Sequence, residues 1–237
     1  MKLNLISNGN TNAKTIKNES ETYILYLSPY NLNSTGKNIC PFASKGCAEA
    51  CLNSAGRGVF SNVKNARIRK TDLFFNDPIL FFSQLLSDLS KINSKAVKEN
   101  KNIFIRLNGT SDLDFDKLLI RYTGLGLLSF GSLRFYDYTK DKNKARNFAK
   151  YSENDIYRVT YSRKETDQDN EIKTLLNYGV NVAVVFNSGN LPDNYLGFPV
   201  INGDLTDLRF NDPSGVVVGL KAKGKAKKDC SGFVVTI

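Results

Sequence analysis

The chain has 237 residues, 41% of them apolar, which is enough for one sizeable domain with a buried core, and its net charge is +10. It contains no histidine, and this excludes mechanisms that depend on imidazole, such as Ser-His-Asp and Cys-His catalysis or histidine-ligated zinc. No apolar run approaches the roughly 18–20 residues of a membrane span, and the N-terminus lacks the features of a signal peptide, so we expect a cytoplasmic protein with reduced thiols.

The order of apolar patterns predicts strands that alternate with helices. Residues 1–20 predict a polar N-terminal arm with a short strand at Leu3–Ile6, and residues 21–237 predict one domain with a Cys-rich loop at 36–58. The predicted strands are Thr22–Leu27, Ile103–Leu107, Leu133–Tyr138, Ile156–Tyr161, Val180–Phe186, Pro199–Ile201, Val216–Leu220 and Phe233–Ile237. The predicted helices are Phe60–Phe75, Pro78–Ser90, Asp114–Arg121, Lys140–Tyr151 and Asp167–Tyr178.

This alternation indicates βαβ units, and therefore an α/β fold with mainly parallel strands. The segment Val180–Phe186 is almost wholly apolar, as expected of a strand that is buried on both faces. Five or six such units favour a closed or partial βα barrel of the TIM type, and an open doubly wound sheet is the rival architecture.

Either architecture places functional residues at the carboxyl ends of the strands. Several polar residues follow or end the predicted strands. The candidates for cofactor binding are Asn108, Gly109, Asp112, Ser162, Arg163, Lys221 and Lys223. The candidates for acid–base chemistry are Asp137 and Asp204.

Three of the four cysteines lie within twelve residues, at Cys40, Cys47 and Cys51, and the fourth is Cys230. In a reducing compartment such a cluster indicates a metal site rather than disulfides. Thiolates without histidine suit a [4Fe–4S] cluster, with Cys230 as a candidate fourth ligand. A zinc site and simple buried thiols are the alternatives.

A three-cysteine loop after the first long strand of a βα fold resembles the radical S-adenosylmethionine enzymes. The resemblance lies in the order of the elements, because the spacing of the cysteines differs from the CxxxCxxC motif of that family. It implies that S-adenosylmethionine binds beside Asn108–Asp112 and that Ser162 or Arg163 meets its carboxylate.

Four segments resemble the phage and plasmid family called gene product 88. They are RLNGTSDL at 106–113, YDYTK at 136–140, VTYSR at 159–163 and the long stretch GDLTDLRFNDPSGVVVGLKAKGKAKKDCSGFVV at 203–235. This resemblance implies a mobile-element origin and a bacterial cytosol, and it implies no particular reaction.

The segment Leu220–Asp229 carries five lysines, which indicates either a phosphate-binding loop or a solvated run of charge. The leading hypothesis is a [4Fe–4S] protein, resembling radical S-adenosylmethionine enzymes, that acts on a nucleotide or nucleic acid. The second is a non-enzymatic nucleic-acid-binding protein in which zinc or an iron–sulfur cluster staples the Cys loop. The third is a barrel enzyme for a phosphate ligand in which the cysteines are incidental.

Overall fold

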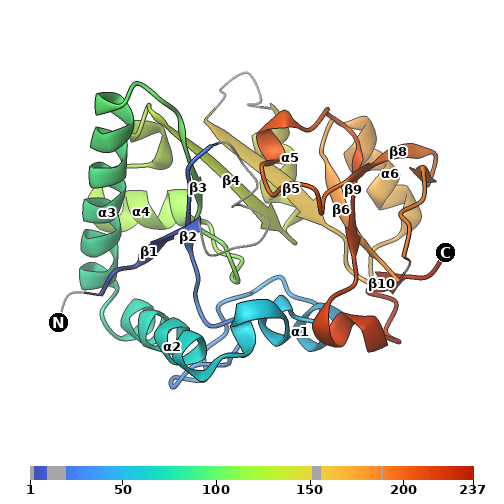
Figure 1. Cartoon of the computed structure of the whole chain (residues 1–237), viewed down its shortest axis with the longest axis horizontal. Coiled ribbons are helices and arrows are strands. Elements are labelled where there is room, and N and C mark those ends of the chain that lie inside the picture. The colour runs from blue at the N-terminus through green and yellow to red at the C-terminus, as the bar shows by residue number, and fades with distance from the viewer. Residues whose placement is uncertain (1–2, 10–19, 151–155, 188) are drawn as a thin grey trace. The chain divides into compact units, whose positions relative to one another are not determined.

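The computed structural model describes residues 3–9, 20–150, 156–187 and 189–237 (Figure 1). The chain divides into two compact units. The first comprises Met1–Pro41, Phe60–Asp137 and Asn154–Tyr157, and the second comprises Phe42–Val59, Tyr138–Glu153 and Arg158–Ile237. Most of the predicted N-terminal arm lies outside the described residues.

The first unit contains strands in the order β1-β2-β3-β4. Strand β1 is antiparallel to β2, whereas β2, β3 and β4 run parallel. The bounds of the strands are Ile6–Asn8 (β1), Thr22–Leu25 (β2), Ile103–Arg106 (β3) and Leu133–Thr139 (β4). The helices of this unit are α2 (Ser61–Asn76), α3 (Pro78–Lys98), α4 (Phe115–Thr123) and the short 3-10 helix η5 (Leu127–Ser129).

Helix α3 shows how the local sequence sets these elements. Pro78 occupies the first turn, where its missing N–H costs nothing, and the Asp77 carboxylate accepts a hydrogen bond from the N–H of Leu80 at 3.0 Å. The buried side chains of α3 recur at helical spacing and include Phe81, Leu85 and Leu89. The helix therefore covers the core with one apolar face.

The second unit contains strands in the order β5-β6-β9-β8-β7, and β10 pairs with β6. All these pairs are parallel except β7 with β8. The bounds of the strands are Tyr157–Ser162 (β5), Val182–Phe186 (β6), Asn194–Tyr195 (β7), Phe198–Asn202 (β8), Val217–Lys221 (β9) and Val234–Val235 (β10). The helices are α1 (Lys45–Glu49), η3 (Leu52–Ser54), η4 (Gly56–Val59), α5 (Lys142–Lys150), α6 (Asp169–Asn177), η6 (Arg209–Asn211) and η7 (Gly224–Lys228).

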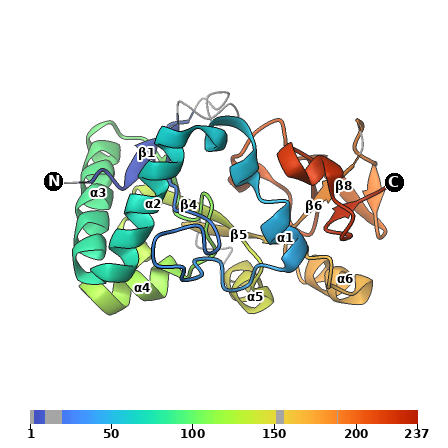
Figure 2. The same cartoon turned by 90° about the horizontal axis from the view of Figure 1, so that it is seen from below.

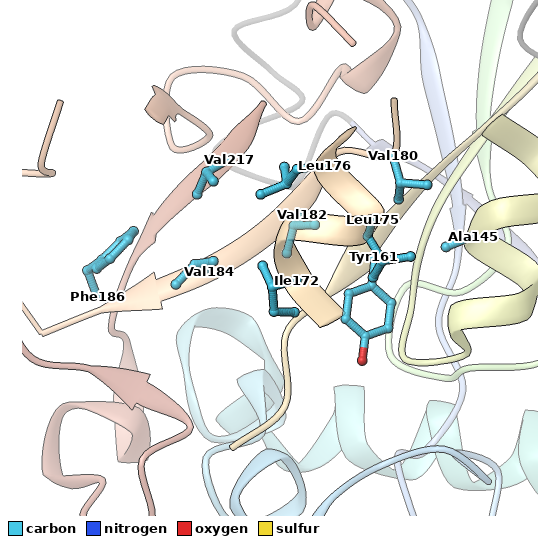
Figure 3. Packing of buried hydrophobic residues seen from close by; sticks show 10 residues of the cluster. All are labelled: Ala145, Tyr161, Ile172, Leu175, Leu176, Val180, Val182, Val184, Phe186 and Val217. Atoms are coloured by element: carbon cyan, nitrogen blue, oxygen red, sulfur yellow. The ribbon is translucent and has the colours of Figure 1, made fainter. Parts of the chain in front are cut away.

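The core of the second unit lies between β6 and the helices α5 and α6, which cover the same face of its strands (Figure 2). Figure 3 shows Val182 and Val184 of β6 beside Ile172 and Leu175 of α6. Tyr161 of β5 belongs to the same cluster, and it is fully buried. The predicted apolar strand Val180–Phe186 is thus confirmed as a central strand.

The α/β class and the mainly parallel strands are confirmed, but the predicted barrel is not found. The sheet is open, with β1 at an edge in the first unit and β7 at an edge in the second. The alternation of strands and helices stops after β6, because β7, β8 and only the 3-10 helix η6 precede β9. Closure into a TIM-type barrel needs eight consecutive βα units, and the described part of the chain does not supply them.

Two smaller differences concern short elements. The sequence predicted no helix inside the Cys loop, whereas the structure places α1, η3 and η4 there. The two-residue strand β7 was also not predicted. Among the residues that the structure describes, there is no helix with the length and hydropathy to cross a membrane.

Candidate functional site

The loop that follows β3 in the first unit is built around the Asn108 side chain. Its Oδ1 accepts hydrogen bonds from Ser111 Oγ and the N–H of Leu113, both at 2.9 Å, and its Nδ2 donates to the carbonyl of Leu113 at 3.0 Å. Nδ2 also donates to Asp137 Oδ2 at 3.0 Å, and the backbone N–H of Asn108 donates to Asp137 Oδ1 at 2.8 Å. Asn108 and Asp137 therefore fix the shape of the loop.

Asp137 is 1% exposed and also accepts a hydrogen bond at 3.0 Å from the hydroxyl of Tyr157. Burial, together with the negative charge of Asp137, raises the pKa of Tyr157 well above its usual value. The phenol therefore stays protonated and donates. In this arrangement both oxygens of the candidate base Asp137 anchor the Asn108 loop.

Cys40 lies against the same loop. Its thiol is 3.7 Å from the carbonyl of Thr110 and accepts a hydrogen bond from the N–H of Tyr30 at 3.4 Å. The buried Asp112 donates its N–H to the carbonyl of Ile39 at 3.3 Å, which holds the chain next to Cys40. Cys40 therefore lies beside the predicted Asn108–Asp112 segment, at the carboxyl end of β3.

In the second unit, Glu165 holds the segment that begins α1. Its carboxylate accepts hydrogen bonds from Ser44 Oγ at 2.5 Å and from the N–H of Gly46 at 2.8 Å. Glu165 follows β5 by three residues, so it too lies at the carboxyl end of a parallel strand. Cys47 is the next residue of α1 after Gly46.

Cys47 packs against an apolar cluster formed by Ala50, Ala226, Phe233 and Val234. The second half of the Cys loop also contacts η7, since the N–H of Lys225 donates to Ser54 Oγ at 3.2 Å. Figure 1 shows the dark red η7 next to the blue-cyan segment that carries α1 and η3. The Cys loop and the C-terminal segment are therefore packed together in this unit.

Cys51 caps the start of η3, and its carbonyl accepts a hydrogen bond from Ser54 Oγ at 2.8 Å. Cys230 is exposed and lies between Asp229 and Ser231, whose side chains are hydrogen-bonded at 2.7 Å.

The predicted cofactor residues Ser162 and Arg163 are engaged with other parts of the second unit. Lys140 Nζ donates to the Ser162 carbonyl at 3.2 Å, to Ser162 Oγ at 3.1 Å and to the Arg163 carbonyl at 3.1 Å. Arg163 Nη1 donates to the carbonyl of Gly232 at 2.9 Å, and the Lys140 ammonium lies 4.7 Å from the ring centre of Phe233. Both cations thus connect the end of β5 to the C-terminal segment.

Asp204 organises the two predicted lysines at the end of β9. One carboxylate oxygen accepts a hydrogen bond from the N–H of Lys221 at 2.8 Å, and the other accepts one from Lys223 Nζ at 2.6 Å. Lys221 Nζ also donates to the carbonyl of Gly189. Next to these groups lies an open cleft of about 310 Å³, lined by Asn190, Leu191, Pro192, Asp193, Val200, Asn202 and Lys221.

The four cysteines are thiols; Cys40, Cys47 and Cys51 are partly exposed. Cys40 belongs to the first unit, and the other three belong to the second. Over the described ranges, no group of three or more Cys, Asp or Glu side chains is arranged to hold a metal ion. The predicted set of metal ligands therefore remains a prediction, which is based on the thiolate chemistry of the donors.

Sequence reasoning missed Glu165 and Tyr157. Glu165 could have been found by the rule that polar residues after parallel strands are candidates, because it lies just after the predicted Arg163. Tyr157 carried no such signal, since an aromatic residue inside a strand usually belongs to the core.

Neither a search of curated proteins nor a search of solved structures gives a match to this chain. These comparisons give no support to the resemblance to radical S-adenosylmethionine enzymes. A protein-family model, described as gene product 88, matches residues 4–236. The match covers nearly the whole chain, so the protein belongs to the gene product 88 family.

Proposed function

We propose that this protein binds a [4Fe–4S] cluster through Cys40, Cys47 and Cys51. The supporting observation is that hydrogen bonds hold two stretches of the Cys loop, each within its own unit and each at the carboxyl end of a parallel strand: Ile39–Cys40 by the loop after β3, and Ser44–Gly46 by Glu165 after β5. The three thiols are partly exposed, so an added metal can reach them. Bound there, such a cluster supplies one-electron transfer.

The test is to purify the full chain without oxygen and to measure its visible spectrum, iron, sulfide and zinc. The expected result is a brown protein with about four irons and four sulfides per chain. Cys47→Ser is expected to lose the iron, while Ala48→Ser, which adds a hydroxyl to the same helix and keeps the thiol, retains it. Circular dichroism is the check that both variants fold.

If the purified protein contains zinc and no sulfide, the site is a structural zinc site and not an iron–sulfur cluster. If it contains no metal, both assignments are wrong. In the iron-loaded protein, Cys230→Ser tests the fourth ligand: loss of about one iron per chain is expected if Cys230 caps the cluster. Addition of S-adenosylmethionine to the reduced protein tests that cofactor, because its binding to an open iron changes the paramagnetic resonance spectrum.

A second candidate function is binding of a nucleotide or nucleic acid. It is favoured by three exposed lysines of η7, Lys225, Lys227 and Lys228. They follow closely after Lys223, whose ammonium group is bonded to Asp204. A row of exposed lysines at the carboxyl end of a strand is suited to phosphate groups. This function is compatible with either metal.

A further inference from the structure

The contact between Glu165 and the Cys loop joins residues that are about 120 positions apart. Each carboxylate oxygen of Glu165 accepts one hydrogen bond: Oε2 from the Ser44 hydroxyl at 2.5 Å and Oε1 from the N–H of Gly46 at 2.8 Å. Ser44 is the N-cap of α1, and its Oγ also accepts the N–H of Cys47 at 3.4 Å. One side chain after β5 thereby fixes the first turn of the helix that carries Cys47.

The charge state of Glu165 favours this contact. Burial alone would raise the pKa of its carboxyl group, but the hydrogen bonds from Ser44 and Gly46 and the nearby Lys140 ammonium lower it below the usual value. The side chain is therefore a carboxylate at neutral pH. Hydrogen bonds to an ionised acceptor are about twice as strong as those between neutral groups.

The surroundings of Gly46 show that this fit is close. A Cβ atom at this position would lie 2.3 Å from Ser231 Oγ, 2.9 Å from Phe233 Cβ and 3.0 Å from Glu165 Cδ. The backbone at Gly46 thus packs closely against both Glu165 and the C-terminal segment, and a larger residue at position 46 fits only if these neighbours shift.

We infer that Glu165 is a positioning residue, which holds Cys47 in place for metal binding by clamping Ser44 and Gly46. These two hydrogen bonds join parts of the protein chain itself, whereas their role in metal retention rests on the proposed cluster. Loss of the clamp frees the first turn of α1 and exposes the Cys47 thiol more often.

The first test measures alkylation by iodoacetamide in the metal-free full chain, followed at each cysteine by mass spectrometry. Glu165→Ala is expected to raise the rate at Cys47 by up to about tenfold, since one charge-assisted hydrogen bond corresponds to roughly this factor and the thiol is already partly exposed. Glu165→Gln keeps an acceptor for the N–H of Gly46 and is expected to give a smaller increase. Glu49→Gln, which neutralises an exposed carboxylate on the same helix, is the matched control and is expected to match the unmodified protein.

Cys40 serves as an internal reference, because its hydrogen bonds with Tyr30 and Thr110 lie within the first unit. An unchanged rate at Cys47 overturns the inference, and so does an equal increase at Cys40, which indicates general unfolding. If Glu165→Ala does not fold, Gly46→Ala disturbs the same contact from the other side and is expected to raise the rate at Cys47 alone.

The second test measures iron retained after reconstitution with ferrous iron and sulfide. Glu165→Ala is expected to retain less iron than Glu49→Gln. If Cys47→Ser loses iron but Glu165→Ala retains it fully, the positioning role is wrong while the cluster stands. If Cys47→Ser retains iron, the proposed ligand set is wrong. The alkylation result then shows independently whether Glu165 holds the first turn of α1.

Discussion

Glu21, directly before β2, accepts hydrogen bonds from Tyr23 and Lys95, both at 2.6 Å, and pairs with Lys101 at 3.1 Å. Burial would raise the pKa of its carboxyl group, but these three partners lower it from 4.5 to about 2. A carboxyl group with a lowered pKa stabilises the folded state above the pKa of the unfolded chain, and this contribution is lost as the pH falls toward the folded value.

We therefore expect the free energy of unfolding to decrease as the pH falls from about 4.5 to about 2. Glu21→Gln is expected to lower it by about 1–2 kcal/mol at pH 7, a value reduced for screening because Lys95 and Lys101 are 38% and 42% exposed. Urea denaturation at several pH values measures this. The difference in the free energy of unfolding between the unmodified protein and Glu21→Gln should shrink toward zero at pH 2. A constant difference across this pH range would contradict the assignment.

At the scale of elements, the loop after β3 depends on Gly109. A Cβ atom there would lie 2.6 Å from Tyr26 Cδ1, 2.8 Å from Ile24 Cγ2 and 2.8 Å from the carbonyl oxygen of Leu25. The N–H of Gly109 donates to that same carbonyl at 3.0 Å, so the loop cannot move away without losing a hydrogen bond. The sequence singled out Gly109 as a ligand-binding residue, and the structure adds this steric reason for glycine.

Gly109→Ala is expected to lower the free energy of unfolding by about 1–3 kcal/mol, as overpacking of a well-filled site does. Gly131→Ala is the control in the same unit, because a Cβ atom at Gly131 meets nothing within 4 Å. Denaturation with urea compares the two variants. Equal stability of both variants would show that the loop can shift to accept a methyl group.

The elements that the sequence predicted correctly are those whose signals are local. The predicted helix Asp167–Tyr178 corresponds to α6 at Asp169–Asn177, where Gln168 and Glu171 form a capping box and Gly179 follows with a φ of +86°. The short helix α1 was missed because its N-cap, Ser44, is fixed by Glu165 from a distant part of the chain.

The same distinction applies to the candidate site. The rule about carboxyl ends of strands identified Asn108 and Asp112, and these lie beside Cys40. The rule could not show that Asp137 and Arg163 would be engaged with Tyr157 and with the C-terminal segment. Such partners are set by packing between residues far apart in sequence, and neither spacing nor periodicity records them.

At the scale of the whole molecule, the charge of +10 overstates the number of cations that are available to a partner. Lys70 is buried and donates to the carbonyl of Leu5, and burial lowers its pKa to about 8. Lys140 bonds to carbonyl groups at the end of β5, and Lys142 pairs with Asp167 at 2.8 Å. The lysines of η7 differ from these because their side chains are exposed.

If η7 binds nucleic acid, replacing its three exposed lysines should weaken binding more than removing three lysines elsewhere on the surface. Each lost phosphate contact lowers the slope of log affinity against log salt concentration by roughly 0.7 for a single strand, so Lys225, Lys227 and Lys228 together account for about 2. Fluorescence anisotropy with a labelled single-stranded oligonucleotide measures this for the triple glutamine variant. The control removes the same charge from exposed helix positions, at Lys91, Lys98 and Lys173. Because both variants lose three charges, an equal change in slope would assign the effect to net charge, and no binding at low salt would remove nucleic acid as a partner.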